Sequence, residues 1–101
     1  MARIVFADRA TADAIGIYTD LNAKAGLQTV EKFSDLFRKL YDRLADQPDS
    51  GALRPALGQN VRIGIVLPYI VIYRHEETQG IVNILRIVHG RRRITAKMIF
   101  D

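Results

Sequence analysis

Apolar residues in the first half of the chain recur at helical spacing after a short strand-like opening. Residues 3–6 are Arg-Ile-Val-Phe, a β-branched and aromatic run that predicts a strand. From 9 to 25 the apolar positions step by three or four residues, which predicts an amphipathic helix with Asp8 as its N-cap and Gly26 as its stop. A second stripe, which Thr29 would cap, comprises Val30, Phe33, Phe37, Leu40 and Leu44. The short connection between the two stripes predicts an antiparallel helical hairpin.

The second half of the chain changes from helical to strand-like periodicity. Residues 48–60 include two prolines and two glycines, which predicts a loop. Three runs rich in Ile, Val and Tyr follow at 61–66, 69–74 and 81–88, and they predict an antiparallel meander. Residues 89–101 predict a short C-terminal helix or tail. The order β-α-α-β-β-β describes an α+β fold in which a helical hairpin packs on a small, mainly antiparallel sheet.

The predicted sheet has more apolar surface than two helices can cover. In the second and third runs of the meander both alternating sets of side chains are apolar, so both faces of the sheet need a cover. The hairpin covers one face. We expect another chain to cover the second face, which would make this protein one half of a complex. The alternative is that Met98, Ile99 and Phe100 of the C-terminal tail suffice.

Length and composition limit the classes of protein that fit. With 101 residues, 49% of them apolar, the chain suits one domain spanning 1–101. It has no cysteine and only two histidines, so we expect no disulfide, no metal site and no cofactor. The opening apolar stretch is too short for a signal peptide, and no apolar run is long enough for a membrane span. We therefore expect a cytoplasmic protein with no membrane contact.

Positive charge is concentrated in the second half of the chain. Residues 1–50 hold seven basic and eight acidic residues, a net charge of −1, whereas residues 51–101 hold eight basic and three acidic residues, a net charge of +5. Such an asymmetry either aids solubility or marks a surface for an anionic partner, a nucleic acid or an acidic protein.

An arginine cluster stands directly after the last predicted strand. It consists of Arg91, Arg92 and Arg93, which follow His89 and Gly90. With Arg86 and Arg74, one edge of the sheet could gather five arginines, a side chain suited to phosphate or carboxylate recognition. Arg86 interrupts an apolar strand, so it must face solvent or find a carboxylate. The alternative is that the cluster is only a solvated run of charge.

The sequence contains no recognisable catalytic motif. There is no nucleophile elbow, no phosphate-binding glycine loop and no His-Glu-x-x-His spacing. His75 and His89 are isolated, and an isolated histidine at a strand end is more often structural than catalytic. The residues alone therefore offer few candidates for catalysis.

Three segments are distinctive: Ala-Asp-Ala-Ile-Gly-Ile-Tyr (12–18), Tyr-Ile-Val-Ile-Tyr-Arg (69–74) and Ile-Leu-Arg-Ile-Val-His-Gly-Arg-Arg-Arg-Ile (84–94). Together with the order of the elements, they resemble the ParE toxins of the RelE/ParE superfamily. The resemblance implies the toxin of a bacterial type II toxin-antitoxin system, neutralised by a cognate antitoxin. It implies an antitoxin that is a ParD-like ribbon-helix-helix protein, in a heterotetramer or larger complex. It further implies inhibition of DNA gyrase by binding, with a block of replication, so the resemblance implies an inhibitor that is not an enzyme. The expected target contacts are Arg86, His89, Arg91, Arg92 and Arg93.

The same superfamily implies an alternative activity. Its RelE-type members are ribosome-dependent mRNA endonucleases that use basic residues on the sheet and often a C-terminal tyrosine or histidine. This chain departs from that pattern, because its strand at 61–64 has no lysine and its tail after the arginine cluster has no tyrosine. If it cleaves RNA, the catalytic candidates are Arg62, Arg74 and His89. A further alternative is a nucleic-acid-binding module that contacts phosphates through the arginine cluster.

Overall fold

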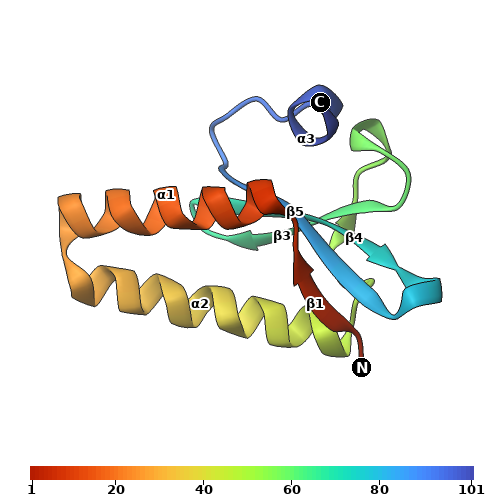
Figure 1. Ribbon diagram of the computed structural model, residues 1–101, viewed down its shortest axis with the longest axis horizontal. Coiled ribbons are helices and arrows are strands. Elements are labelled where there is room, and N and C mark those ends of the chain that lie inside the picture. Colours follow the sequence, from red (N-terminus) through yellow and green to blue (C-terminus); the bar gives the residue numbers. More distant parts are fainter.

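The computed structural model describes residues 1–101 as a five-stranded sheet with a helical hairpin on one face and a short helix on the other (Figure 1). The elements are β1 (Arg3–Phe6), α1 (Asp8–Ala25), α2 (Leu27–Asp46), β2 (Ala52–Leu53), β3 (Val61–Val66), β4 (Tyr69–Glu76), β5 (Ile81–His89) and α3 (Ala96–Phe100), with short 3-10 helices at Pro55–Leu57 and Glu77–Gln79. The strand order is β1-β5-β4-β3-β2, with β1 parallel to β5 and every other pair antiparallel. The predicted α+β fold is confirmed, and β2 is an addition within the predicted loop.

Both predicted helix N-caps are wrong. Ala7 is the N-cap of α1, and Asp8 is the first helical residue. The carboxylate of Asp8 interacts favourably with the positive end of the helix dipole. Thr29 lies inside α2, and its hydroxyl donates to the carbonyl oxygen of Ala25 at 3.3 Å. Thr29 is not the cap because Gly26, with a φ of +86°, is both the C-cap of α1 and the N-cap of α2, and is the single residue between the two helices.

The larger core lies between the hairpin and the sheet. Its buried residues are Ala10, Phe37, Leu40, Leu44, Val66, Tyr69, Val71, Tyr73, Val82, Ile84 and Ile87. Gly64 of β3 sets the distance between the layers, because a Cβ atom there would come within 2.9 Å of the Leu40 side chain. The apolar stripes of the predicted helices therefore do face the predicted meander.

The second face of the sheet is covered by the chain itself. Ile99 of α3 is buried together with Leu57, Val61, Ile63, Ile72 and Val88, and Ile94 and Met98 pack against this cluster. The expectation that another chain covers this face is therefore wrong. Five residues of α3 suffice because the 3-10 helix at Pro55–Leu57 adds Leu57 to the same cover.

Tyr73 ties the loop after α2 to the sheet. Its ring is fully buried, and its hydroxyl donates to the carbonyl oxygen of Pro48 at 2.7 Å. The hydroxyl oxygen of Tyr73 in turn accepts from the N–H of Gly51 at 3.0 Å. A side chain at position 51 would come within 2.5 Å of this hydroxyl and of a main-chain oxygen of β3. The loop is therefore fixed at the hairpin side of the sheet.

Tyrosine burial predicts a loss of stability in alkaline solution. Burial raises the pKa of Tyr41 and Tyr73, since the phenolate is poorly solvated inside the fold. A raised pKa in the folded state stabilises the fold below the unfolded tyrosine pKa of about 10, and this contribution is lost as the pH rises beyond it. Thermal melts from neutral pH to above pH ~10 should show a falling melting temperature, and Tyr41→Phe should reduce the slope. A flat profile would contradict the prediction.

Candidate binding site around the C-terminal arginines

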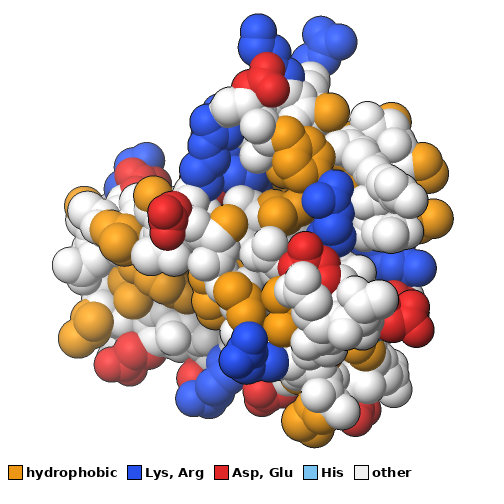
Figure 2. Space-filling model, turned by 45° about the vertical axis from the view of Figure 1, so that its right-hand side comes forward, with side chains coloured by type: hydrophobic (Ala, Val, Ile, Leu, Met, Phe, Trp, Pro, Cys, Tyr) orange, Lys and Arg blue, Asp and Glu red, His pale blue; other side chains and the backbone are white.

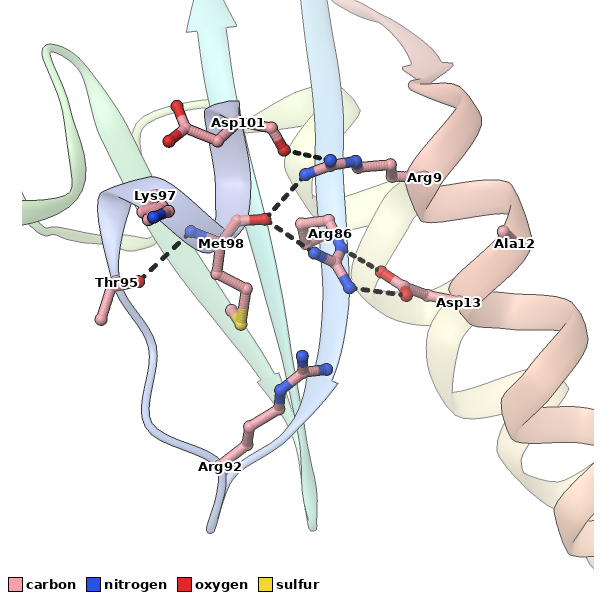
Figure 3. A pocket seen from close by; sticks show the side chains of 9 residues that line it. All are labelled: Arg9, Ala12, Asp13, Arg86, Arg92, Thr95, Lys97, Met98 and Asp101. Carbon is pink, nitrogen blue, oxygen red and sulfur yellow. Dashed lines mark hydrogen bonds and ion pairs between the residues drawn. The ribbon is translucent and has the colours of Figure 1, made fainter.

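A cavity of about 640 Å³ opens where α1, β5 and the segment 91–101 meet (Figure 3). Its lining residues are Arg9, Ala12, Asp13, Arg86, Arg92, Thr95, Lys97, Met98 and Asp101. Four of these side chains are cationic and two are carboxylates, so the cavity carries an excess of positive charge. An anionic group is the partner that such a lining favours.

Arg86 and Asp13 form an ion pair at the rear of this cavity. The guanidinium donates from Nε to Asp13 Oδ2 at 2.7 Å and from Nη2 to Oδ1 at 3.0 Å, and the two side chains are only 11% and 17% exposed. The hydrogen bonds to Asp13 raise the pKa of Arg86. From its place in an apolar strand, Arg86 was predicted either to face solvent or to pair with a carboxylate. The structure shows that it pairs with a carboxylate.

Asp13 also completes the edge of the sheet. The pairing of β1 with β5 ends at Ile84, so the next part of β5 has β4 on one side and no strand on the other. There Asp13 Oδ2 accepts from the N–H of Ile87 at 2.9 Å. The Asp13 carboxylate therefore accepts hydrogen bonds both from a main-chain N–H at the edge of β5 and from the Arg86 guanidinium, which also contacts α3.

Two arginines hold the C-terminal end of α3. Arg86 Nη1 and Arg9 Nη1 donate to the carbonyl oxygen of Met98 at 2.8 and 3.0 Å, and Arg9 Nη2 donates to the carbonyl oxygen of Asp101. At the other end Thr95 Oγ1 accepts from the N–H of Met98 at 3.2 Å, which caps the helix. A helix of this length has no independent stability, so these contacts and Ile99 fix its position.

The arginine cluster is not used by the fold. Arg91, Arg92 and Arg93 are exposed, and none of their side chains forms a hydrogen bond or an ion pair. Arg92 points into the cavity from the segment below α3 (Figure 3). Figure 2 shows Lys and Arg side chains gathered at the top of the molecule, around α3. The fold therefore presents free guanidinium groups beside a cationic cavity.

His89 shapes the start of the cluster. Its ring packs edge-on against Tyr69 at 5.9 Å, and Nδ1 accepts from the N–H of Arg91 at 3.2 Å. His89 and Arg91 line a second cavity of about 440 Å³, which shares Ala12, Asp13 and Arg92 with the first. His89 thus positions the arginine segment.

The structure does not gather all five arginines at one edge. Arg74 lies on β4, donates to the carbonyl oxygen of Gln59 at 3.0 Å and stacks over the Phe100 ring at 4.9 Å. The guanidinium of Arg86 donates hydrogen bonds to Asp13 and Met98. The prediction is wrong because Arg74 and Arg86 lie on inner strands of the sheet and each forms contacts within the chain.

The structure also separates the residues predicted for RNA cleavage. His89 pairs with Tyr69 at the start of β4, whereas Arg74 lies five residues further on, a span of roughly 17 Å at about 3.4 Å per residue. Arg62 donates to the carbonyl oxygens of Asp49 and Gly51 at 3.0 and 2.9 Å. His89 therefore does not share a site with Arg62 or Arg74.

A different histidine lies near Arg62 and Arg74. His75 Nδ1 is 2.8 Å from Asp49 Oδ1, and Arg62 Nε is 3.5 Å from the same oxygen. These side chains and Arg74 line a polar cavity of about 460 Å³. The sequence did not predict this grouping, because Asp49 comes from the loop after α2, whose path no periodicity predicts. No three or more His, Asp or Glu side chains lie together in a way that could hold a metal ion.

Asp13 and Arg9 are the other residues that the sequence analysis missed. Asp13 is three residues from Ala10 and four from Ile17, both of which pack toward the core, so it is an acidic residue within an apolar stripe. That position was the available signal, since a carboxylate there requires a buried partner. Arg9 carried no such signal.

Comparisons with known proteins identify the class as the toxin of a type II toxin-antitoxin system. The model of the family described as ParE toxin of type II toxin-antitoxin system, parDE, matches residues 4–94, and the chain belongs to this family. A solved structure of the chromosomal ParDE system from P. aeruginosa is similar, with a TM-score of 0.72 and 23% identity over 88% of this chain and 96% of that one. No curated protein matches the sequence. None of the helices is long and apolar enough to cross a membrane.

Proposed function

We propose that the chain inhibits DNA gyrase by binding, through a contact surface formed by Arg91, Arg92, Arg93 and Lys97. The observation that carries the proposal is that the three adjacent arginines are exposed and unpaired beside a cationic cavity, in a chain of the ParE family. Adjacent like charges repel one another, so a fold gains little from them, and an anionic partner accounts for them better. Gyrase inhibition would block replication.

The other predicted contacts divide into two roles. His89 lies beside the surface and sets the path of the arginine segment, so we assign it a positioning role. The guanidinium of Arg86 forms its hydrogen bonds within the fold, and we assign Arg86 the role of holding α3 in place. In this proposal no residue carries out a chemical step on a substrate.

The proposed protein partner is a cognate antitoxin of the ParD-like ribbon-helix-helix class. Support comes from the family, whose description names a toxin-antitoxin system. Because α3 covers the second face of the sheet, the antitoxin would bind elsewhere on the toxin. We propose a cytoplasmic complex, a heterotetramer or larger, whose size sedimentation of the co-expressed pair would measure.

The runner-up is ribosome-dependent mRNA cleavage, and the cavity with His75 and Asp49 is the observation that favours it. Against it, the guanidinium groups of Arg62 and Arg74 donate to carbonyl oxygens of the fold. A nuclease would need these groups free to contact a phosphate.

Expression of the chain without antitoxin distinguishes the two activities. We expect filamentous cells with an induced DNA-damage response, and continued protein synthesis in pulse labelling. His75→Gln should remain fully toxic and His89→Gln should lose only part of its toxicity, since neither residue transfers a proton in a binding mechanism. Rapid arrest of translation, with cut mRNA and loss of toxicity in His75→Gln, would support cleavage instead.

A further inference from the structure

The two cavities beside the arginine cluster join into one groove. The larger has a volume of about 640 Å³ and the smaller about 440 Å³, and they share Ala12, Asp13 and Arg92. Helix α1 forms one wall of the groove, and the segment from Arg91 to α3 forms the other (Figure 3). A ligand that occupies both parts of the groove is therefore elongated.

Three cationic side chains along the groove have no partner within the chain. Arg91, Arg92 and Lys97 are exposed, and their side chains form neither ion pairs nor hydrogen bonds. Arg9 and Arg86 add positive charge in the larger cavity. A guanidinium has five N–H groups, of which Arg9 uses two and Arg86 three, so both still have donors left. The groove therefore offers donors at several points along its length.

The acidic residues of the groove do not compete for these cations. Asp13 is paired with Arg86, and the Asp20 carboxylate lies 3.0 Å from Lys24. The third acidic side chain is that of Asp101, whose carboxylate points away from Arg86 (Figure 3). The side chains left unpaired inside the groove are therefore cationic, and they favour an anionic ligand.

The groove has little of the exposed apolar surface that a protein partner uses. Only two of the nine lining residues of the larger cavity are apolar, Ala12 and Met98. In the smaller cavity Tyr69, Ile87 and Val88 are no more than 8% exposed. Protein–protein interfaces centre on apolar and aromatic side chains, whereas protein–DNA interfaces are more polar and strongly positive. The composition of the groove therefore favours a chain of phosphate groups over an acidic protein.

We propose that this groove binds the phosphodiester backbone of a DNA strand, with Arg91, Arg92 and Lys97 in contact with its phosphates. The inference deepens the proposed function and rests on it for the source of the strand, because gyrase acts on DNA. The toxin then contacts the DNA that gyrase holds, as well as the enzyme. Phosphate contacts carry no base specificity, so the groove accepts any DNA sequence.

The test uses the purified full chain and a labelled oligothymidylate of about 12 nucleotides, within the range of known single-strand sites, in anisotropy titrations at several salt concentrations. We expect saturable binding that weakens as salt rises, because phosphate contacts release counterions. Arg92→Ala combined with Lys97→Ala should reduce the slope of log K against log salt by about 1.4, since each contact with a single strand contributes about 0.7. The matched control, Lys39→Ala with Arg43→Ala, removes the same two residue types from exposed positions outside the groove and should leave the slope unchanged.

A steric variant tests whether the strand lies in the groove. Gly16 of α1 lines the smaller cavity, and nothing lies within 4 Å of the position that its Cβ would take. Gly16→Leu therefore fits the fold, and it should not lower the melting temperature because leucine favours a helix more than glycine does. It should weaken oligothymidylate binding at least about fivefold, although no charge changes. Unchanged binding would place the strand outside the groove and overturn the proposal.

Competition distinguishes phosphate from carboxylate. Unlabelled poly-aspartate of the same charge should compete at least about tenfold less well than unlabelled oligothymidylate. Equal competition would overturn the proposal in favour of an acidic protein surface. No saturable binding up to ~100 μM chain in ~50 mM salt would also overturn it, as would an equal loss of slope in the control variant.

These readouts do not involve gyrase, so the two proposals can fail separately. DNA binding by a chain that does not inhibit gyrase would contradict only the proposed target. Gyrase inhibition by a chain that binds no DNA would contradict only the role of the groove.

Discussion

Replacing Arg91, Arg92 and Arg93 together by alanine is expected to abolish toxicity and leave the fold intact. These side chains are exposed and make no contact within the chain, so the melting temperature should change by less than about 4 °C. Each charge-assisted hydrogen bond to a target is worth ~1.5–3 kcal/mol, so losing three should weaken target affinity at least about a thousandfold. Plate toxicity and thermal melts of the variant measure the two effects.

The matched control removes the same charge elsewhere. Lys24, Lys32 and Arg38 are exposed on the hairpin, and their joint replacement by alanine lowers the net charge equally. We expect this control to remain toxic, because the effect depends on the position of the arginines and not on total charge. A triple-arginine variant that folds and kills as well as the parent would contradict the proposed surface.

Asp13→Ala is expected to cause the largest loss of stability among single changes in the site. It leaves Arg86, whose side chain is only 11% exposed, without its carboxylate and removes the acceptor for the N–H of Ile87. Removing one partner of a buried ion pair costs ~3–5 kcal/mol, and the partial exposure of this pair places the loss toward the lower value. Denaturant unfolding measures it, and α3 should become the least protected segment in hydrogen exchange.

Two further variants show whether the ion pair is the cause. Asp13→Ala combined with Arg86→Met removes the uncompensated charge and should recover part of the lost stability. Asp20→Ala breaks the exposed pair with Lys24, whose side chains are 57% and 74% exposed, and should cost less than ~1 kcal/mol. If Asp13→Ala lowers the free energy of unfolding no more than Asp20→Ala does, the contacts of Asp13 and Arg86 that hold α3 contribute little to stability.

The fold was predictable to the extent that it depends on local periodicity. The stripe from Val30 to Leu44 and the runs from Val61 onward give the correct helices and strands, because burial of one face imposes a period on the sequence. The cover of the second sheet face was not predictable in this way. It depends on where a five-residue helix docks, which Arg9, Arg86 and Ile99 decide through contacts distant in sequence.

The candidate site was predictable in its charge but not in its geometry. Three adjacent arginines after Gly90 mark an exposed cationic segment in any fold. The ion pair of Arg86 joins residues 73 positions apart, so only the tertiary structure identifies its partner as Asp13. Likewise, the strand register decides that His89 lies far from Arg74, and the path of the loop after α2 decides that Asp49 lies beside His75.

A supercoiling assay tests the central claim most directly. Purified gyrase is given relaxed plasmid and increasing amounts of the wild-type chain, the triple-arginine variant or the matched control. We predict that the wild-type chain and the control suppress supercoiling, and that the triple-arginine variant does not at the same concentrations. Normal supercoiling in the presence of a wild-type chain that still kills cells would contradict gyrase as the target.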